Sequence, residues 1–341
     1  MPNNLISNVQ WLVPIENCTI ELAEKSNLAS VRLRCALSAV EYKKMGFNVS
    51  FSDGFGSNLP DVLFVGKIDN ITDKSRSERW INYIIECQKN GGQIITDYTD
   101  HHLSAENDKS TFYKKALPNS DSIICSSNLL AKHLETFGFK NSTVIPDPYE
   151  VELTLPNDKK NSIKTALWFG HSTNIPYFLN FLLKLNGFQE PLKIIALTNA
   201  YPIPDEILKK LAIIVPDHID ICFLPWSLDN LIHVAKMSDF TLIPAGVDNP
   251  RKSGASSNRL ITSLVLGLPT LADPLDSYLE FSEFFKILSI DNLTKFIKHT
   301  FEDQLEVVCK AQILIAQRFS KDGISIDWSN FIKKLPSQRI H

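Results

Sequence analysis

One polar loop in the carboxyl-terminal half of the chain has residue types that could bind an anion. The loop runs from Arg251 to Ser257 and precedes a helical pattern from Asn258 to Leu266, which Gly267 can end. The first amides of a helix are unpaired and the helix dipole is positive there, so this end of a helix attracts phosphate. A serine is a good N-cap at such a place. The side chains that we expect to assist are Lys252, Ser253, Ser256, Ser257, Asn258 and Arg259. A capped helix with solvated basic residues is the alternative interpretation.

A second set of reactive residue types follows the apolar run Gln93–Thr96. The segment Asp97–His102 reads DYTDHH, and carboxylates and imidazoles can accept protons or attack carbon. We expect Asp100 and His101 to act as general base or nucleophile, or to contact a substrate. A polar loop in which Asp97 caps a turn is one alternative. A metal site is another, although the basic loop and its helix end can neutralise a phosphate without a metal, so we expect none.

Four further positions are candidates for anion binding. Arg32 and Arg34 open the helical pattern Leu28–Met45, at the end expected beside the carboxyl end of the first strand. Their guanidinium groups could hold a carboxylate or a phosphate. The alternative is a solvated or ion-paired helix face. His171 and Asn174 follow the first strand pattern of the second half and could contact the same anion as the basic loop. For His171 the alternative is an ordinary turn residue.

The elements that must position these residues follow from the spacing of apolar residues. Short β-branched runs alternate with longer amphipathic stretches along the chain. We predict strands at 11–13, 48–51, 61–65, 93–96, 122–125, 143–145, 165–169, 193–197, 219–223, 240–243 and 269–272. We predict helices at 28–45, 75–89, 127–137, 176–185, 205–211, 228–237 and 258–266, and a mostly helical stretch at 305–334. Strands that alternate with helices form parallel sheets covered on both faces, and such sheets bind ligands at the carboxyl ends of their strands.

The alternation is interrupted by a polar segment that contains the turn-forming run Asn157–Asn161. We therefore predict an α/β chain with two Rossmann-like, doubly wound parallel-sheet domains that face a cleft. The expected parts are a first domain at 1–148, a linker at 149–164, a second domain at 165–318 and a helical tail at 319–341. We expect the tail to pack back toward the first domain.

Composition excludes several classes of protein. The chain has 341 residues, with 35 lysines and arginines against 38 aspartates and glutamates, and a net charge of −3. Proteins that bind nucleic acid through bulk charge are usually basic, so we expect no nucleic-acid partner. A hydrophobic content of 44% excludes a wholly disordered chain. The six cysteines form no C-x-x-C pair, which disfavours a zinc site or a disulfide framework and favours reduced thiols.

The sequence also bears on location. Its start has no basic segment followed by an apolar one, and no apolar run approaches the roughly 20 residues that span a bilayer. Lys333, Lys334 and Arg339 could touch an anionic membrane surface. We expect a cytoplasmic protein, with at most peripheral contact at the inner face of the membrane.

The order of the elements resembles that of the GT-B glycosyltransferases of the group 1 type, which have two Rossmann-like lobes with a nucleotide-sugar in the cleft. Residues 240–272 resemble the donor-binding strand, loop, helix and strand, with Gly267-Leu268-Pro269 before the last strand. Residues 125–147 resemble the last strand, helix and strand of the acceptor lobe, and residues 165–174 resemble the first strand and turn of the donor lobe. The tail, with Phe319, Ser320 and Trp328, resembles the closing helices. The resemblance covers nearly the whole chain. It implies that 1–148 is the acceptor-side domain and 165–318 the donor domain.

Two departures from the family pattern affect the expected chemistry. Many retaining members have a Glu, seven residues and a second Glu before the Gly-x-Pro, and the corresponding positions here are Gly254 and Thr262. The second Glu usually contacts the ribose, so ribose recognition must differ. Many members also have an Arg and a Lys after the first donor-lobe strand to hold a diphosphate. Here His171–Ile175 contains neither, so a donor with one phosphate, such as a CMP-sugar, becomes plausible.

The resemblance implies a metal-independent transferase that moves a sugar from a nucleotide-sugar to a saccharide or lipid-linked saccharide. In that interpretation the basic loop, His171 and Asn174 bind the donor, and Asp100 or His101 deprotonates the acceptor. Arg32 and Arg34 would bind the acceptor or an acidic sugar. The implied setting is cell-surface polysaccharide or lipopolysaccharide assembly. The alternatives are a non-catalytic protein that binds sugars or nucleotide-sugars, and a nucleotide-sugar epimerase with the same two-lobed shape.

Overall fold

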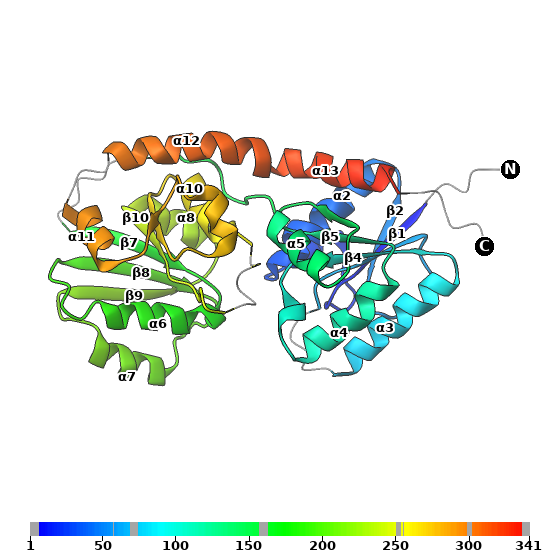
Figure 1. The fold of residues 1–341 in the computed structure, drawn as a ribbon, viewed down its shortest axis with the longest axis horizontal. Helices are drawn as coiled ribbons and strands as arrows, with labels where there is room; N and C mark the ends of the chain where they lie inside the picture. The colour runs from blue at the N-terminus through cyan, green and yellow to red at the C-terminus, as the bar shows by residue number, and fades with distance from the viewer. Residues whose placement is uncertain are drawn as a thin grey trace. The chain divides into compact units, whose positions relative to one another are not determined.

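The computed structural model describes residues 7–56, 58–68, 74–156, 163–249, 254, 256–298 and 302–335. Its internal contacts divide the chain into two compact units. Unit 1 consists of Met1–Pro148, Pro250–Ser256 and Phe319–His341, and unit 2 of Tyr149–Asn249 and Ser257–Arg318. Each unit contains a parallel sheet flanked by helices (Figure 1).

Unit 1 has a six-stranded sheet in the order β2-β1-β3-β4-β5-β6, and all its neighbouring strands are parallel. The strands are β1 (Asn8–Leu12), β2 (Asn48–Ser52), β3 (Val62–Val65), β4 (Gln93–Tyr98), β5 (Ser122–Cys125) and β6 (Ser142–Val144). Every residue of β3 and β4 is buried, because helices cover both faces of the sheet. The sequence prediction of a parallel sheet in this half is therefore confirmed.

The helices of unit 1 connect these strands. They are α1 (Ile20–Glu24), the π-helical η1 (Val31–Ala36), α2 (Leu37–Lys44), α3 (Lys74–Lys89), the short η2 (His102–Ser104), α4 (Asp108–Ala116), η3 (Leu117–Asn119), α5 (Asn128–Thr136) and α13 (Lys321–Lys333). The helix predicted at 28–45 is thus a π-helical segment followed by an α-helix. A π-helix is rare and often marks a functional or strained position.

Helix α13 supplies part of the core of unit 1. Its Trp328 is fully buried and meets Trp11 edge to face, with 5.7 Å between ring centroids. It makes similar contacts with Phe64 at 6.2 Å and Tyr42 at 6.5 Å. Residues from β1, β3 and α2 therefore share one aromatic cluster with a helix from the other end of the sequence.

Unit 2 has a second six-stranded parallel sheet, in the order β12-β11-β10-β7-β8-β9. The strands are β7 (Lys164–Phe169), β8 (Leu192–Thr198), β9 (Ile219–Pro225), β10 (Phe240–Ile243), β11 (Thr270–Ala272) and β12 (Lys286–Ile287). The helices are η4 (Ser172–Asn174), α6 (Ile175–Lys184), α7 (Asp205–Ile214), α8 (Leu228–Met237), α10 (Asn258–Val265), η5 (Asp276–Phe281), α11 (Ile290–Lys298) and α12 (Glu302–Phe319). The prediction of two doubly wound α/β units is confirmed, with β12 as an unpredicted edge strand.

Helix α10 is anchored in unit 2 by its apolar face and its carboxyl end. Leu260, Ile261, Leu264 and Val265 are all buried. Gln312 of α12 donates a hydrogen bond of 2.9 Å to the carbonyl of Leu264. Gly267, at φ +78°, ends the helix where an added Cβ would lie only 2.6 Å from the carbonyl oxygen of Thr154. A fixed carboxyl end holds the amino end of α10 in a defined place at the sheet edge.

None of the described helices is both long and apolar enough to cross a membrane.

Candidate functional site

The amino end of α10 lies at the carboxyl edge of the unit 2 sheet, where it follows β10. Ser257 occupies the N-cap position, but its side chain makes no capping hydrogen bond. Ser227 at α8, by contrast, accepts a hydrogen bond from the Asn230 amide in the usual way. Ser257 therefore stands at the predicted N-cap position, but its hydroxyl accepts no hydrogen bond from the amides of the first turn of α10.

Arg259, in the first turn of α10, has an unsatisfied hydrogen-bonding atom. Its Nη1 is buried and has no hydrogen-bond partner among the described residues. Asp273, which follows β11, accepts a hydrogen bond of 2.8 Å from the Ala245 amide. Burial raises the pKa of Asp273, while that amide and the charges of Lys184 and Arg259 oppose the rise. Buried donors nearly always have a partner, so this guanidinium nitrogen has the capacity to donate to an acceptor oxygen.

The residues that follow β7 lie at the same edge, because β7 pairs with β10. His171 is exposed, and its Nδ1 accepts a hydrogen bond from the Thr173 amide at 3.3 Å. Asn174 is buried and precedes α6. Ser256, Ser257 and Asn258 are half-buried at the start of α10. Lys252 and Ser253, which we also predicted as phosphate ligands, lie outside the described residues.

In unit 1, Asp100 follows β4 and forms an ion pair with Lys67, which follows β3. His102 Nε2 lies 3.7 Å from the same carboxylate oxygen. The Asp100 side chain is 30% exposed, so it can meet a substrate while keeping these partners. The sequence analysis missed Lys67. The signal in the sequence was a charged residue that comes directly after the apolar strand Val62–Val65 and Gly66.

His101 lies beside Asp100 in sequence but is held in a different environment. Its ring stacks on that of His133 of α5, with 4.2 Å between centroids and 9° between planes. Burial, together with the nearby His133, lowers the pKa of His101 to about 4. The imidazole is therefore neutral near pH 7. We assign the proton-acceptor role to Asp100 because its side chain is 30% exposed, whereas His101 is buried.

This environment predicts the titration of His101. Its folded pKa lies below the usual value near 6.5, so the neutral ring stabilises the fold above about pH 6.5. That contribution is lost as the pH falls toward 4. In a histidine NMR titration, we expect His101 to keep a constant shift between pH 8 and 5. Replacing His133 with alanine should raise the His101 pKa. A wild-type His101 that titrates near pH 6.5 would contradict the stacked, buried arrangement.

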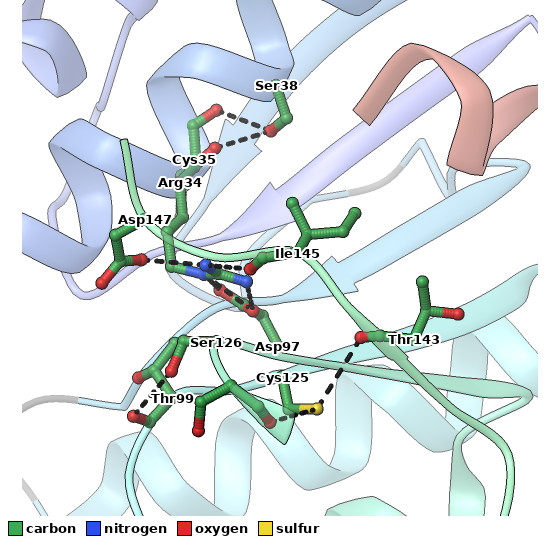
Figure 2. A network of polar contacts seen from close by, with 11 residues as sticks. Arg34, Cys35, Ser38, Asp97, Thr99, Cys125, Ser126, Thr143, Ile145 and Asp147 are labelled. Carbon is green, nitrogen blue, oxygen red and sulfur yellow. Dashed lines mark hydrogen bonds and ion pairs between the residues drawn. The ribbon is translucent and has the colours of Figure 1, made fainter. Parts of the chain in front are cut away.

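Arg34 of η1 is fully buried and directs its guanidinium at groups of its own unit (Figure 2). It donates to both carboxylate oxygens of Asp97, at 2.7–2.9 Å. It also donates to the Ile145 carbonyl and to Asp147 Oδ1, both at 2.8 Å. The Trp328 ring lies 5.4 Å from its Cζ. This placement gives Arg34 a role inside unit 1, where its guanidinium is not open to an acceptor.

Two neighbouring predictions are affected by the same geometry. Asp97 lies inside β4 and is fully buried, instead of capping a turn after the strand. Arg32 is half-buried and donates a hydrogen bond to the carbonyl of Ser26. The two arginines therefore do not converge on one anion site. Among the described residues, no group of three or more His, Cys, Asp or Glu is arranged to hold a metal ion.

Gly254 replaces the first glutamate of the family pattern, and the structure shows what surrounds it. An added Cβ would lie 2.6 Å from Leu130 Cδ2 and 3.3 Å from His101 Cβ, within unit 1. A glutamate at this position would require Leu130 to move. The second family position, Thr262, is half-buried in α10.

No family model matches this sequence, and no match was found among curated proteins. Solved structures do match. A glycosyltransferase from Rickettsia africae has a TM-score of 0.64 at 12% identity, over 97% of this chain and 100% of that chain. The lipopolysaccharide outer core galactosyltransferase WaaB has 0.58 at 10% identity, over 96% and 99%. An alpha-glucosyltransferase bound to UDP-glucose and DNA has 0.59 at 11% identity, over 96% and 99%. The chain has the GT-B fold.

These likenesses concern the fold, because the identities are only 10–12%. The GT-B fold implied by the sequence resemblance is thereby confirmed. The chain spans 59% of the longer TarM of S. aureus, at a TM-score of 0.56.

Proposed function

We propose that this protein is a glycosyltransferase that moves a sugar from a nucleotide-sugar to a saccharide or glycolipid acceptor. The observation that carries the proposal is the buried, unpartnered Nη1 of Arg259 in the first turn of α10. A phosphate oxygen at this place would satisfy that nitrogen and meet the positive end of the helix. The neighbours with the same fold, which include enzymes that transfer galactose and glucose, support the assignment.

The proposed reaction needs a leaving group to be stabilised and a proton to be accepted. As the anomeric C–O bond breaks, its electron pair passes to the nucleotide phosphate, where Arg259 and the α10 amides stabilise the developing charge. The acceptor oxygen bonds to the anomeric carbon, and its proton passes to Asp100. The remaining donor-side candidates among the described residues are Ser256, Ser257, Asn258, His171 and Asn174. Lys252 and Ser253 are also proposed to bind the donor. Arg32 stays a candidate on the acceptor side.

Two donor classes are in competition. The turn after β7 has no arginine or lysine to hold a second phosphate, which supports a one-phosphate donor such as a CMP-sugar. The alpha-glucosyltransferase of the same fold was solved with UDP-glucose, which supports a diphosphate donor. For the acceptor, the lipopolysaccharide outer core named for WaaB supports a role in cell-surface polysaccharide assembly.

Nucleic acid is the class of acceptor that competes with a saccharide, and an acceptor screen can test it. The alpha-glucosyltransferase neighbour was solved with DNA, whereas a net charge of −3 argues against binding polyanions through bulk charge. We propose a saccharide acceptor, and a duplex oligonucleotide belongs in the acceptor screen as the competing class.

One observation favours a second function. Gly254 and Thr262 stand where many retaining members have their glutamates, which is what a sugar-binding protein without activity would also show. Turnover separates the candidates. A transferase consumes donor when an acceptor is present, an epimerase interconverts donors, and a binding protein does neither.

The proposal is tested by thermal-shift measurements with CMP-, UDP-, GDP- and dTDP-linked sugars. A ligand that binds only the native state raises the melting temperature with its affinity. Replacing Arg259 with glutamine should weaken donor binding about 10- to 100-fold, because hydrogen bonds to charged groups contribute about 1.5–3 kcal/mol each. Arg318→Gln is the matched control, since Arg318 is exposed and pairs with Glu280. Full donor binding by Arg259→Gln, or no stabilisation by any nucleotide-sugar, would refute the assignment.

A further inference from the structure

Strands β3 and β4 bring Lys67 and Asp100 together at the carboxyl edge of the unit 1 sheet. The two strands pair in parallel with Val65 opposite Thr96, so the residues that follow them are neighbours in space. Lys67 Nζ forms an ion pair with Asp100 Oδ2. The two side chains are 28% and 30% exposed, so water shields the pair only in part.

The backbone is fixed on both sides of Lys67. The Gly66 amide donates to the Leu12 carbonyl at 3.1 Å, and an added Cβ on Gly66 would lie 2.5 Å from the same oxygen. On the other side, Ile68 is fully buried in the second core cluster of unit 1. This anchoring fixes the backbone of Lys67 at the sheet edge, and the ion pair with Asp100 places its ammonium group.

The groups that face Asp100 come from several elements. His102 of η2 lies 3.7 Å away through Nε2, and its ring stacks on Tyr113 of α4 with 4.9 Å between centroids. Burial raises the pKa of Tyr113 and of Tyr98, and the charge of Asp100 adds to both shifts. Asp97 of β4 is a second nearby carboxyl, and Lys67 acts to lower its pKa. Lys67 therefore adds a positive charge to a region that contains two carboxylates.

We propose that Lys67 is a positioning residue for the transfer reaction, which holds the Asp100 carboxylate where it can accept the acceptor's proton and extends its ionised range to lower pH. The inference rests on the proposed function, because that function assigns the proton to Asp100. Only an ionised Asp100 can take the proton from the acceptor hydroxyl as the new glycosidic bond forms. A cation within about 4–6 Å typically lowers a carboxyl pKa by about 1–3 units. Partial exposure places the effect of Lys67 at the lower end of that range.

The kinetic test compares the pH dependence of kcat/KM in wild type, Lys67→Met and Lys67→Arg. Methionine keeps the length of the side chain without its charge. The Asp100 pKa should rise in Lys67→Met, so the acid limb of the kcat/KM profile should move up by about one pH unit. At pH values below the Asp100 pKa, this shift lowers kcat/KM by about tenfold. The profiles should converge above pH 8, and Lys67→Arg should restore the wild-type limb. An unmoved limb, or an equal loss at every pH, would overturn the inference.

A second readout does not depend on turnover. Carbon-13 NMR titration of the Asp100 carboxyl, assigned with Asp100→Asn, should show a higher pKa in Lys67→Met than in wild type. Lys44→Met is the matched control, because Lys44 pairs with Glu41 in the same unit. An Asp100 titration unchanged by Lys67→Met would overturn the inference even if donor binding succeeds. Failure of every donor to bind would instead refute the proposed function. A shifted titration with an unmoved kinetic limb would exclude a role for Lys67 in catalysis.

Discussion

Replacing Trp328 with alanine is expected to lower the free energy of unfolding of unit 1 by about 3–5 kcal/mol. The indole is fully buried among Trp11, Tyr42 and Phe64, and its removal leaves a cavity where α13 meets β1 and β3. The alanine variant also loses the ring that lies 5.4 Å from the Arg34 guanidinium. Urea unfolding followed by far-ultraviolet circular dichroism should show an earlier transition with the native secondary structure retained in buffer.

Ile326→Ala provides the control for that experiment. Ile326 lies on the same helix but is 60% exposed. Its replacement should change the free energy of unfolding by less than about 0.5 kcal/mol. If both variants unfold alike, α13 is not part of the unit 1 core in solution.

The second large effect is expected at Arg34. Replacing it with methionine leaves Asp97 and Asp147 without the guanidinium that binds them both, and Asp97 is fully buried. Removing one partner of a buried ion pair typically costs about 3–5 kcal/mol. Figure 2 shows that the same change also removes a donor from the Ile145 carbonyl. We therefore expect the variant to unfold at a much lower urea concentration near pH 7.

The pH dependence of this loss has a definite sign. Burial raises the pKa of Asp97, and Arg34 opposes the rise. Without Arg34, the folded pKa of Asp97 should rise further above its unfolded value near 3.9. A group with a raised folded pKa stabilises the fold at low pH and loses that contribution as the pH rises through the folded pKa. Arg34→Met should therefore be closest to wild type near pH 4 and farthest from it near pH 8.

A double variant checks the cause of the effect. Adding Asp97→Asn to Arg34→Met removes the uncompensated charge, so part of the lost stability should return and the pH dependence should flatten. If the double variant is less stable than Arg34→Met, the loss comes from packing and not from an unpaired charge.

The sheet architecture could be read from the sequence because its signals are local. Continuous apolar runs such as Val62–Val65 mark strands that are buried on both faces, and most observed strands overlap a predicted run. Strand β12 was missed because two residues carry no periodicity. The position of α10 and of its amino end was also readable, since a loop, a helix and a glycine stop follow one another directly in the chain.

The roles of individual charged residues could not be read in this way. Arg34 and Asp97 are 63 positions apart, and nothing in either neighbourhood shows that they form a pair. The pairing of Lys67 with Asp100 likewise depends on β3 and β4 being adjacent in the sheet. Burial lowers the pKa of His101, and the nearby His133, which lies on a later helix, adds to that shift. Charge partners are a property of tertiary structure, so a motif such as DYTDHH predicts reactive residue types but not which of them is free to react.

The sharing of one aromatic cluster between β1 and α13 has a consequence for biosynthesis. Residues 1–148 leave the ribosome long before Trp328 does, and at about 5–20 residues per second the delay is roughly ten to forty seconds. During that time the nascent sheet lacks the helix that fills its core, and the apolar surface that α13 covers stays exposed. Expressing the amino-terminal segment alone should therefore give an aggregation-prone fragment, and a synthetic peptide carrying α13 should rescue its solubility.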